Sequence, residues 1–236
     1  MHPTEAIILA GGMGTRLKGV IKDIPKPMAP IQEKPFLEYM LTYLLKHHIN
    51  HVILSVGYKK EVIESYFGEK FKDIKISYAN EDKPLGTGGG IKKALSMVEG
   101  VHAFILNGDS FFNVNLSDLS EFYFAHKADL SMCVKRKKDF FRYGTVDLDV
   151  CKVVGFQEKQ PVKSGLINGG VYITSKNIFD RFTQIPEKFS FEQDFLEKYF
   201  QELKICAMRC SEYFIDIGIP ADYEIAQRDL PAQISI

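Results

Sequence analysis

Two kinds of hydrophobic pattern alternate along the first half of the chain. Short, continuous apolar runs such as Ala6–Ala10 and His51–Val56 end in glycines, which is typical of buried parallel strands. Between such runs, apolar residues recur at every third or fourth position, as in Leu37–Leu45 after Pro35, and this spacing predicts amphipathic helices. By the same criteria we expect strands at Ile74–Ala79 and Ala103–Leu106 and helices at Val62–Phe67 and Gly88–Met97. The alternation predicts an α/β fold with a doubly wound, mostly parallel, Rossmann-like sheet flanked by helices.

After about residue 128 the apolar runs become shorter and more closely spaced, which predicts a smaller β region. Strands are expected at Leu130–Lys135, Tyr143–Leu148, Val153–Gln157, Leu166–Thr174, Ile205–Met208 and Tyr213–Ile217. Helical spacing returns at Ile178–Phe182 and Phe191–Phe200, and Pro220 suits the first turn of a last helix. We expect the tail after Leu230 to be loose. No linker or repeat separates the halves, so residues 1–236 are predicted to form one domain.

Composition narrows the classes of partner. Lys plus Arg and Asp plus Glu both number 30, so the chain lacks the charge excess expected of a protein that binds nucleic acid or an anionic membrane. The sequence has no apolar run near the roughly 18 residues of a membrane span, and its start does not resemble a signal peptide, so we expect a cytoplasmic protein. The spacing of the four cysteines fits neither a zinc site nor a disulfide framework.

The strongest candidate for chemistry is the segment Leu9–Leu17, in which Gly11, Gly12 and Gly14 follow a predicted strand. Glycines let the backbone approach a ligand and direct N–H groups at phosphate oxygens, and the guanidinium of Arg16 matches a phosphate. The segment is not a P-loop, because no Gly-Lys-Ser/Thr follows, and it lacks the third glycine of a dinucleotide fingerprint. Taken alone, it could equally be a tight strand-to-helix turn.

Three further residues suggest a metal-bound polyphosphate. Lys26 lies between two prolines in Pro25–Pro30, which hold it rigidly beside the glycine-rich segment. Asp109 follows the predicted strand Ala103–Leu106, and Asp216 lies at the end of the predicted strand Tyr213–Ile217, where α/β sheets place their ligands. Two such carboxylates can hold Mg²⁺, which completes its octahedron with water and phosphate oxygens. The alternative is that Asp109 caps a turn and that Asp216 pairs with a lysine.

These segments resemble, in order, the motifs of the sugar-1-phosphate nucleotidyltransferase family. The resemblance runs from Ala6 to about Ala226 and rests on Leu9–Leu17, Pro25–Pro30, Pro84–Gly90, Asn107–Asp109, Phe156–Lys159, Asn168–Gly170 and Asp216–Pro220. It implies a nucleotide-binding half (about 1–127) and a sugar-phosphate-binding half (about 128–230). It also implies a nucleoside triphosphate and a sugar 1-phosphate as substrates and Mg²⁺ or Mn²⁺ as the cofactor. A homodimer is compatible with the resemblance.

The resemblance also implies roles for individual residues. Arg16, Lys26 and Asp109 are the expected catalytic residues, and Asp109 and Asp216 the expected metal ligands. The expected nucleotide-binding residues are Leu9, Ala10, Gly11, Gly12, Gly14, Thr15, Glu81, Gly86, Thr87 and Gly88. The expected sugar-phosphate-binding residues are Asn107, Gly144, Glu158, Lys159 and Asn168. The glycines of Gly86–Gly90 are expected to form a loop against the nucleobase, since each would cost about 1 kcal/mol inside a helix.

The substrates can be narrowed further. A carboxylate at Glu81 could accept hydrogen bonds from N1 and N2 of guanine, whereas uracil and thymine offer only N3–H. The segments Pro84–Gly90 and Ser190–Asp194 resemble those of family members that transfer GMP to heptose 1-phosphates. Other substrate pairs remain alternatives: mannose, glucose or N-acetylmuramate 1-phosphate as the acceptor, with GTP, dTTP, CTP or UTP as the nucleotide. A non-catalytic, nucleotide-sensing homologue is a further alternative. A dinucleotide-dependent oxidoreductase is disfavoured, because Val56–Tyr58 contains no acidic ribose ligand.

Overall fold

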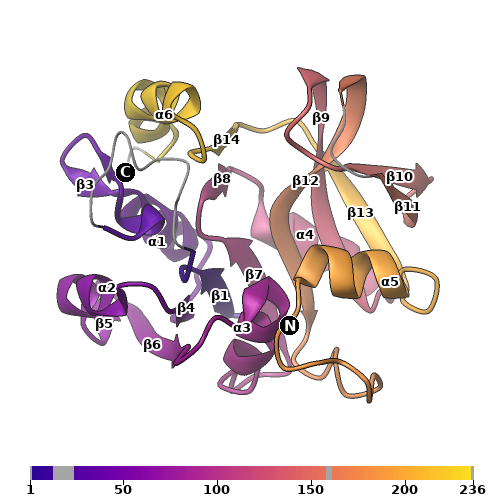
Figure 1. Cartoon of the computed structure of the whole chain (residues 1–236), viewed down its shortest axis with the longest axis horizontal. Coiled ribbons are helices and arrows are strands. Elements are labelled where there is room, and N and C mark those ends of the chain that lie inside the picture. Colours follow the sequence, from indigo (N-terminus) through magenta and orange to yellow (C-terminus); the bar gives the residue numbers. More distant parts are fainter. Residues whose placement is uncertain (1, 13–23, 158–160, 235–236) are drawn as a thin grey trace.

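The computed structural model describes residues 2–12, 24–157 and 161–234. At its centre is one ten-stranded mixed sheet, to which both halves of the chain contribute (Figure 1). The strands of this sheet are β1 (Glu5–Leu9), β4 (His51–Val56), β5 (Lys70–Phe71), β6 (Ile74–Asn80), β7 (His102–Asn107), β9 (Leu130–Phe140), β10 (Thr145–Asp149), β11 (Lys152–Gln157), β12 (Val162–Ser175) and β13 (Ile205–Cys210). Their order across the sheet is β10-β11-β13-β9-β12-β7-β1-β4-β6-β5.

The first half confirms the predicted doubly wound arrangement. Strands β6, β4, β1 and β7 are neighbours in that order and are all parallel, with Ile7 paired to both Ile53 and Ile105. Ala6, Ile7 and Ile8 are fully buried, as expected for a central parallel strand that helices cover on both faces. The carboxyl ends of these strands therefore meet along one edge of the sheet, where α/β proteins bind their ligands.

The prediction of a mostly parallel sheet is wrong for the second half. Strand β12 runs antiparallel to both β7 and β9, and β10 runs antiparallel to β11, while β13 is parallel to β9. These strands extend the sheet of the first half and do not form a separate β region. Apolar runs mark strands and their burial, but the direction of each strand depends on pairings far apart in the sequence.

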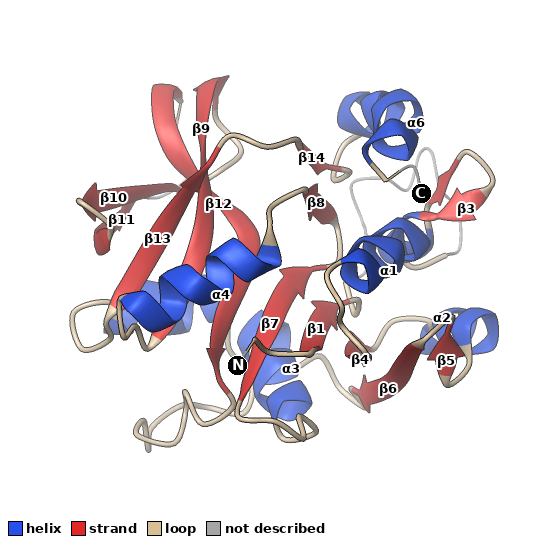
Figure 2. Cartoon of the chain, turned by 180° about the vertical axis from the view of Figure 1, so that it is seen from behind, coloured by secondary structure: helices blue, strands red, loops and turns tan. Residues whose placement is uncertain are grey.

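Helices cover both faces of the sheet. In Figure 1 helix α3 lies in front of the sheet, and the view from behind in Figure 2 shows α1 and α4 on the other face. The helices are α1 (Phe36–Lys46), α2 (Lys60–Phe67), α3 (Gly86–Leu95), α4 (Leu116–Ala125), α5 (Glu197–Tyr199) and α6 (Pro220–Gln233), with a 3₁₀ turn η2 (Lys26–Met28) and a π-helix η3 (Phe191–Leu196). Buried side chains of α1, α2, α4 and α6 share one hydrophobic core, and those of α3 and η3 share the second.

One helix prediction and the prediction of a loose tail need correction, and one helix was missed. Ile178–Phe182 forms turns in which Ile178 and Phe179 are nevertheless buried, so its apolar spacing reflects packing and not a helix. Helix α6 continues to Gln233, so the tail after Leu230 is not loose up to that residue. Helix α4 was not predicted, although the side chain of Asn115 caps it by accepting hydrogen bonds from the backbone N–H groups of Ser117 and Asp118.

Two short ribbons lie outside the main sheet. In one, β2 (Pro30–Ile31) pairs with β3 (Lys34–Pro35), and in the other, β8 (Ser110–Phe112) pairs antiparallel with β14 (Phe214–Asp216). The second ribbon places Asp216 directly opposite Ser110 and so beside Asp109. Within the parts of the chain that the structure describes, none of the helices combines the length and hydrophobicity of a membrane span.

Candidate active site

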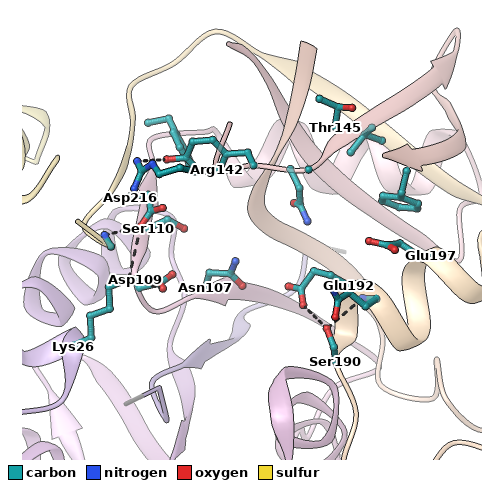
Figure 3. A pocket seen from close by; sticks show the side chains of 18 residues that line it. Lys26, Asn107, Asp109, Ser110, Arg142, Thr145, Ser190, Glu192, Glu197 and Asp216 are labelled. Atoms are coloured by element: carbon teal, nitrogen blue, oxygen red, sulfur yellow. Dashed lines mark hydrogen bonds and ion pairs between the residues drawn. The ribbon is translucent and has the colours of Figure 1, made fainter. Parts of the chain in front are cut away.

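A cavity of about 450 Å³ lies at the carboxyl end of β7 and is lined by residues of both halves of the chain (Figure 3). In Figure 3 a charged group gathers at one end, Ser190 and Glu192 lie toward the other, and Asn107 lies between them. The lining includes Lys26, Asn107, Asp109, Ser110, Arg142, Tyr143, Gly144, Asn168, Ser190, Glu192 and Asp216. The cavity thus contains predicted residues of the catalytic, metal-binding and sugar-phosphate-binding sets.

At the charged end, one lysine contacts two carboxylates. Nζ of Lys26 lies 2.7 Å from Oδ2 of Asp109 and 3.8 Å from Oδ1 of Asp216. The Lys26 side chain is only 12% exposed, against 48% for Asp109 and 22% for Asp216. Pro25 precedes the turn η2, and the neighbouring Pro27 is buried, so the backbone that carries the lysine is held in place. Both alternatives considered for Asp216, metal ligand and lysine partner, meet at this one position.

Pairing of the β8–β14 ribbon brings the two carboxylates together. The backbone N–H of Ile217 donates to the carbonyl of Asp109 at 3.0 Å, and the N–H of Gly218 donates to Oδ1 of Asp216 at 2.7 Å. Residues 107 positions apart are therefore fixed against each other by backbone hydrogen bonds, which leaves their carboxylates little freedom to separate. Such preorganisation is what a cation site built from two carboxylates needs.

This donor set fits Mg²⁺ or Mn²⁺. Two carboxylates already converge on a single positive charge, the ammonium group of Lys26. Mg²⁺ is commonly held by one or two carboxylates, with water and substrate phosphates completing its octahedron. Asp109 and Asp216 would hold such an ion.

Two asparagines line the middle of the cavity. Oδ1 of Asn107 is buried, and among the described residues it has no hydrogen-bond partner, so a ligand donor would satisfy it. Nδ2 of Asn168 donates to the hydroxyl of Tyr172 at 2.6 Å, and its Oδ1 accepts from the N–H of Gly170 at 3.0 Å. Asn168 is thus already fixed in orientation, whereas Asn107 has the greater capacity to bind a substrate.

Arg142 is a site residue that the sequence analysis missed. Its Nη2 pairs with the carboxylate of Asp222 in α6 and donates to the hydroxyl of Tyr143 at 3.1 Å. Burial raises the pKa of Tyr143, and the negative charge of Asp216 raises it further, so Tyr143 stays protonated at neutral pH. The signal available in the sequence was the position of the arginine two residues before Gly144, which was expected to bind the sugar phosphate.

Glu81 lies at the glycine-rich end of β1. Its Oε1 accepts from the hydroxyl of Ser55 at 3.1 Å, and its Oε2 accepts from the N–H of Leu85 at 2.9 Å. A Cβ atom at Gly11 would lie 3.3 Å from Oε1, and one at Gly90 only 2.9 Å away. Each carboxylate oxygen can accept a second hydrogen bond, so Glu81 can still accept hydrogen bonds from a ligand bound beside Gly11.

The expectation of a loop at Gly86–Gly90 is wrong, since these residues begin α3, which starts two residues before the predicted helix Gly88–Met97. Glycines are needed there because a Cβ at Gly88 would lie 2.2 Å from the ring of Phe189 and one at Gly89 2.5 Å from the carbonyl oxygen of Glu187. The hydroxyl of Thr87 donates to Oε2 of Glu192 at 2.9 Å, which links α3 to η3. Nucleotide contacts by Gly86, Thr87 and Gly88 stay predictions.

Other predicted residues can be placed only in part. Leu9 ends β1, the N–H of Ala10 donates to the carbonyl of Ser55 at 2.8 Å, and a Cβ at Gly12 would have no neighbour within 4 Å among the described residues. Gly144 lines the cavity. Gly14, Thr15, Arg16, Glu158 and Lys159 lie outside the described residues.

Replacing Gly86 with alanine is expected to destabilise the protein. Gly86 has a φ of +73°, and an added Cβ would lie 2.5 Å from the carbonyl oxygen of Phe189. The left-handed backbone costs other residues roughly 1–2 kcal/mol, and overpacking typically costs about 1–3 kcal/mol more. In a chain of this size we expect the melting temperature to fall by roughly 5–15 °C. The control Gly57→Ala, whose Cβ would make an ordinary 3.5 Å contact, should melt nearly as the parent does; equal melting of both variants would contradict this packing.

Comparison with known proteins finds relatives over nearly the whole chain. The profile of the family described as nucleotidyl transferase matches residues 5–233. D-glycero-alpha-D-manno-heptose 1-phosphate guanylyltransferase of Aneurinibacillus thermoaerophilus is 51% identical over 96% of this chain and 98% of that protein. Mannose-1-phosphate guanylyltransferase of Mycobacterium tuberculosis is 34% identical over 97% of this chain and 65% of its own length. The crystal structure of HddC from Yersinia pseudotuberculosis complexed with GMP-PN has a TM-score of 0.84 and 39% identity, covering 96% of this chain and 98% of that one.

The matches extend over nearly the whole chain, and the site combines two carboxylates, a lysine and an adjoining cavity at the ligand-binding edge of the sheet. On this evidence the chain belongs to the nucleotidyl transferase family.

Proposed function

We propose that the protein transfers GMP from GTP to a heptose 1-phosphate, forming a GDP-heptose and pyrophosphate. The observation that carries this proposal is the convergence of Lys26, Asp109 and Asp216 at one end of a cavity lined by both halves of the chain. GTP and heptose are favoured because the relative at 51% identity is named for guanylyl transfer to a heptose 1-phosphate. In this proposal residues 1–127 bind the nucleotide and residues 128–230 bind the sugar phosphate.

The reaction is an in-line displacement at the α-phosphorus of GTP. An oxygen of the sugar 1-phosphate forms the new P–O bond, and the bond to the β-phosphate oxygen breaks, so that pyrophosphate leaves. A phosphomonoester has a second pKa of about 6, so the nucleophile is largely dianionic at neutral pH and needs no general base. Catalysis then consists of bringing two anions together and neutralising their charge.

Several residues divide this work. Lys26 supplies a fixed positive charge beside the phosphates, and Arg142 supplies a second positive charge at the same end of the cavity. Mg²⁺ or Mn²⁺, held by Asp109 and Asp216, would neutralise phosphate charge when bound. The unsatisfied Oδ1 of Asn107 would accept a hydrogen bond from a hydroxyl of the bound sugar. Arg16, Lys159 and Glu158 have the same proposed roles as in the sequence analysis.

Guanine selection is assigned to Glu81, whose carboxylate would accept from N1–H and N2–H of the base. We expect Glu81→Gln to lower kcat/KM for GTP roughly 10- to 100-fold, because an amide nitrogen would then face a donor of the base. ATP and UTP should be affected much less. A comparable loss with all nucleotides would instead show that Glu81 acts only through its bonds to Ser55 and Leu85.

The proposed function is tested by measuring pyrophosphate release from GTP, ATP, CTP, UTP and dTTP with heptose, mannose, glucose and N-acetylmuramate 1-phosphates. The highest kcat/KM is expected for GTP with heptose 1-phosphate. A clear preference for UTP or dTTP would contradict the assignment of guanine. The absence of pyrophosphate release from every pair would favour a nucleotide-sensing role over an enzyme.

A further inference from the structure

The cavity has two chemically different ends. Among the described residues that line it, the two cations are Lys26 and Arg142, and both lie at the end that holds Asp109 and Asp216 (Figure 3). At the opposite end Figure 3 shows Ser190 and Glu192, whose side chains present hydroxyl and carboxylate oxygens. Gln193 follows Glu192 and also lines the cavity. This second end offers neighbouring acceptors and an amide donor, which is the chemistry that recognises hydroxyl groups.

The second end is a rigid structure. The residues Ser190–Glu197 form the π-helix η3 and its caps, and π-helical turns are frequent at functional sites. The Ser190 hydroxyl accepts from the N–H of Gln193 at 3.2 Å, and Asp194 accepts from the N–H of Ser190 at 2.7 Å. On the other face of η3 the rings of Phe191 and Phe195 are fully buried and stacked 5.8 Å apart. The aromatic core therefore fixes the direction in which the polar residues point.

Glu192 is also held in position from the nucleotide side. Its Oε2 accepts from the Thr87 hydroxyl at 2.9 Å and from the Ser190 hydroxyl at 3.3 Å. The same Thr87 oxygen accepts from the N–H of Phe191 at 2.8 Å. A carboxylate oriented in this way loses little freedom when it accepts a further hydrogen bond, which favours specificity. Gln193, by contrast, is exposed in the free protein, so its amide is accessible to a ligand in the cavity.

The proposed reaction determines how a sugar must lie in this cavity. Its anomeric phosphate has to reach Lys26 and Asp216, so the carbons farthest from that phosphate point to the opposite end. In a manno-configured heptose these are the exocyclic C6 and C7, which carry a vicinal pair of hydroxyls. Mannose has the same ring but only C6 and one exocyclic hydroxyl. The two sugars thus differ in the part of the molecule that would face Glu192 and Gln193.

We infer that Glu192 and Gln193 bind the exocyclic diol of the acceptor sugar and so select a seven-carbon over a six-carbon sugar phosphate. This inference rests on the proposed function, which places the exocyclic carbons of the sugar at this end of the cavity. The carboxylate of Glu192 accepts from one hydroxyl, and the amide of Gln193 bonds to its neighbour. A site built for a hydroxyl discriminates against an analogue that lacks it, since the polar groups of the protein then go unpaired.

The test compares kcat/KM for heptose 1-phosphate and mannose 1-phosphate, both with GTP, in the parent and three variants. For Gln193→Ala we expect a fall of about tenfold with heptose 1-phosphate and less than twofold with mannose 1-phosphate. For Glu192→Gln, which keeps the shape and an acceptor for Thr87, we expect a fall of roughly 10- to 100-fold, again confined to the heptose. Gln201→Ala is the matched control, because Gln201 is exposed and lies outside the cavity lining.

Melting temperatures within 2 °C of the parent, about the shift for 1 kcal/mol, would show that the variants are folded. An unchanged ratio of heptose to mannose activity in both cavity variants, or an equal fall for both sugars, would overturn the inference while leaving the proposed function intact. A parent enzyme that releases no pyrophosphate from GTP with either sugar would overturn the proposed function, and the selection inferred from it would fall as well.

Discussion

Replacing Asp109 with alanine is expected to lower turnover at least a hundredfold while the protein stays folded. Asp109 is 48% exposed and lies in the turn between β7 and β8, so its truncation removes little packing. Its carboxylate contacts Lys26 and faces Asp216, and the proposed metal ion would lose one of its two protein ligands. Loss of one electrostatic element that stabilises developing charge commonly costs 10²–10³ in kcat, about 3–4 kcal/mol.

The expected signature is a fall in kcat measured by pyrophosphate release at saturating GTP and sugar phosphate, with an unchanged circular dichroism spectrum. Asp149→Ala is a suitable control, since Asp149 is exposed at the end of β10 and does not line the cavity. Turnover of the Asp109→Ala variant within a few-fold of the parent would remove this residue from the mechanism.

Replacing Lys26 with methionine is expected to lower kcat by about 10²–10³ as well, since this change keeps the length of the side chain and removes its charge. Lys26 is the most buried member of the cluster, at 12% exposure, so its charge acts in a partly desolvated setting where electrostatic interactions are strong. Lys26→Arg should not restore activity, because a planar guanidinium cannot replace a compact ammonium between two carboxylates.

For this second prediction Lys34→Met is the matched control. Lys34 is 61% exposed and pairs with Glu38 on the surface, so its loss should change kcat less than twofold. Full activity of the Lys26→Arg variant would mean that any positive charge suffices at this position, which would contradict the geometric account. Since Lys26 and Asp109 are in contact, their effects should be less than additive in the double variant.

The sequence predicted the elements that local pattern can specify. The strands around Ile7 and Ile53 and the helix that follows Pro35 were placed within one or two residues, because continuous apolar runs and helical spacing mark them directly. Lys26 and Asp109 were found because flanking prolines and a strand end are also local signals. Strand direction in the second half was not predictable in this way, since β12 pairs with β7 over about 70 positions of the chain.

The parts of the site that escaped prediction depend on such long-range pairing. Asp216 and the strand that carries it were predicted, but the pairing of this strand with β8, which brings Asp216 beside Asp109, was not. The bond from Thr87 to Glu192 joins residues 105 positions apart, and the unsatisfied oxygen of Asn107 becomes visible only once its surroundings are packed. Glycines at Gly86–Gly90 were interpreted as a loop because their low helix propensity was weighed without Phe189, whose ring requires them.

The most direct test of the central claim is the identity of the product formed from GTP and D-glycero-α-D-manno-heptose 1-phosphate in the presence of Mg²⁺. Phosphorus NMR and mass spectrometry should show a GDP-heptose and pyrophosphate in equal amounts, and the Asp109→Ala variant should form neither at a comparable rate. Conversion of GTP to GDP or GMP without a sugar-linked product, or no reaction at all, would contradict the account.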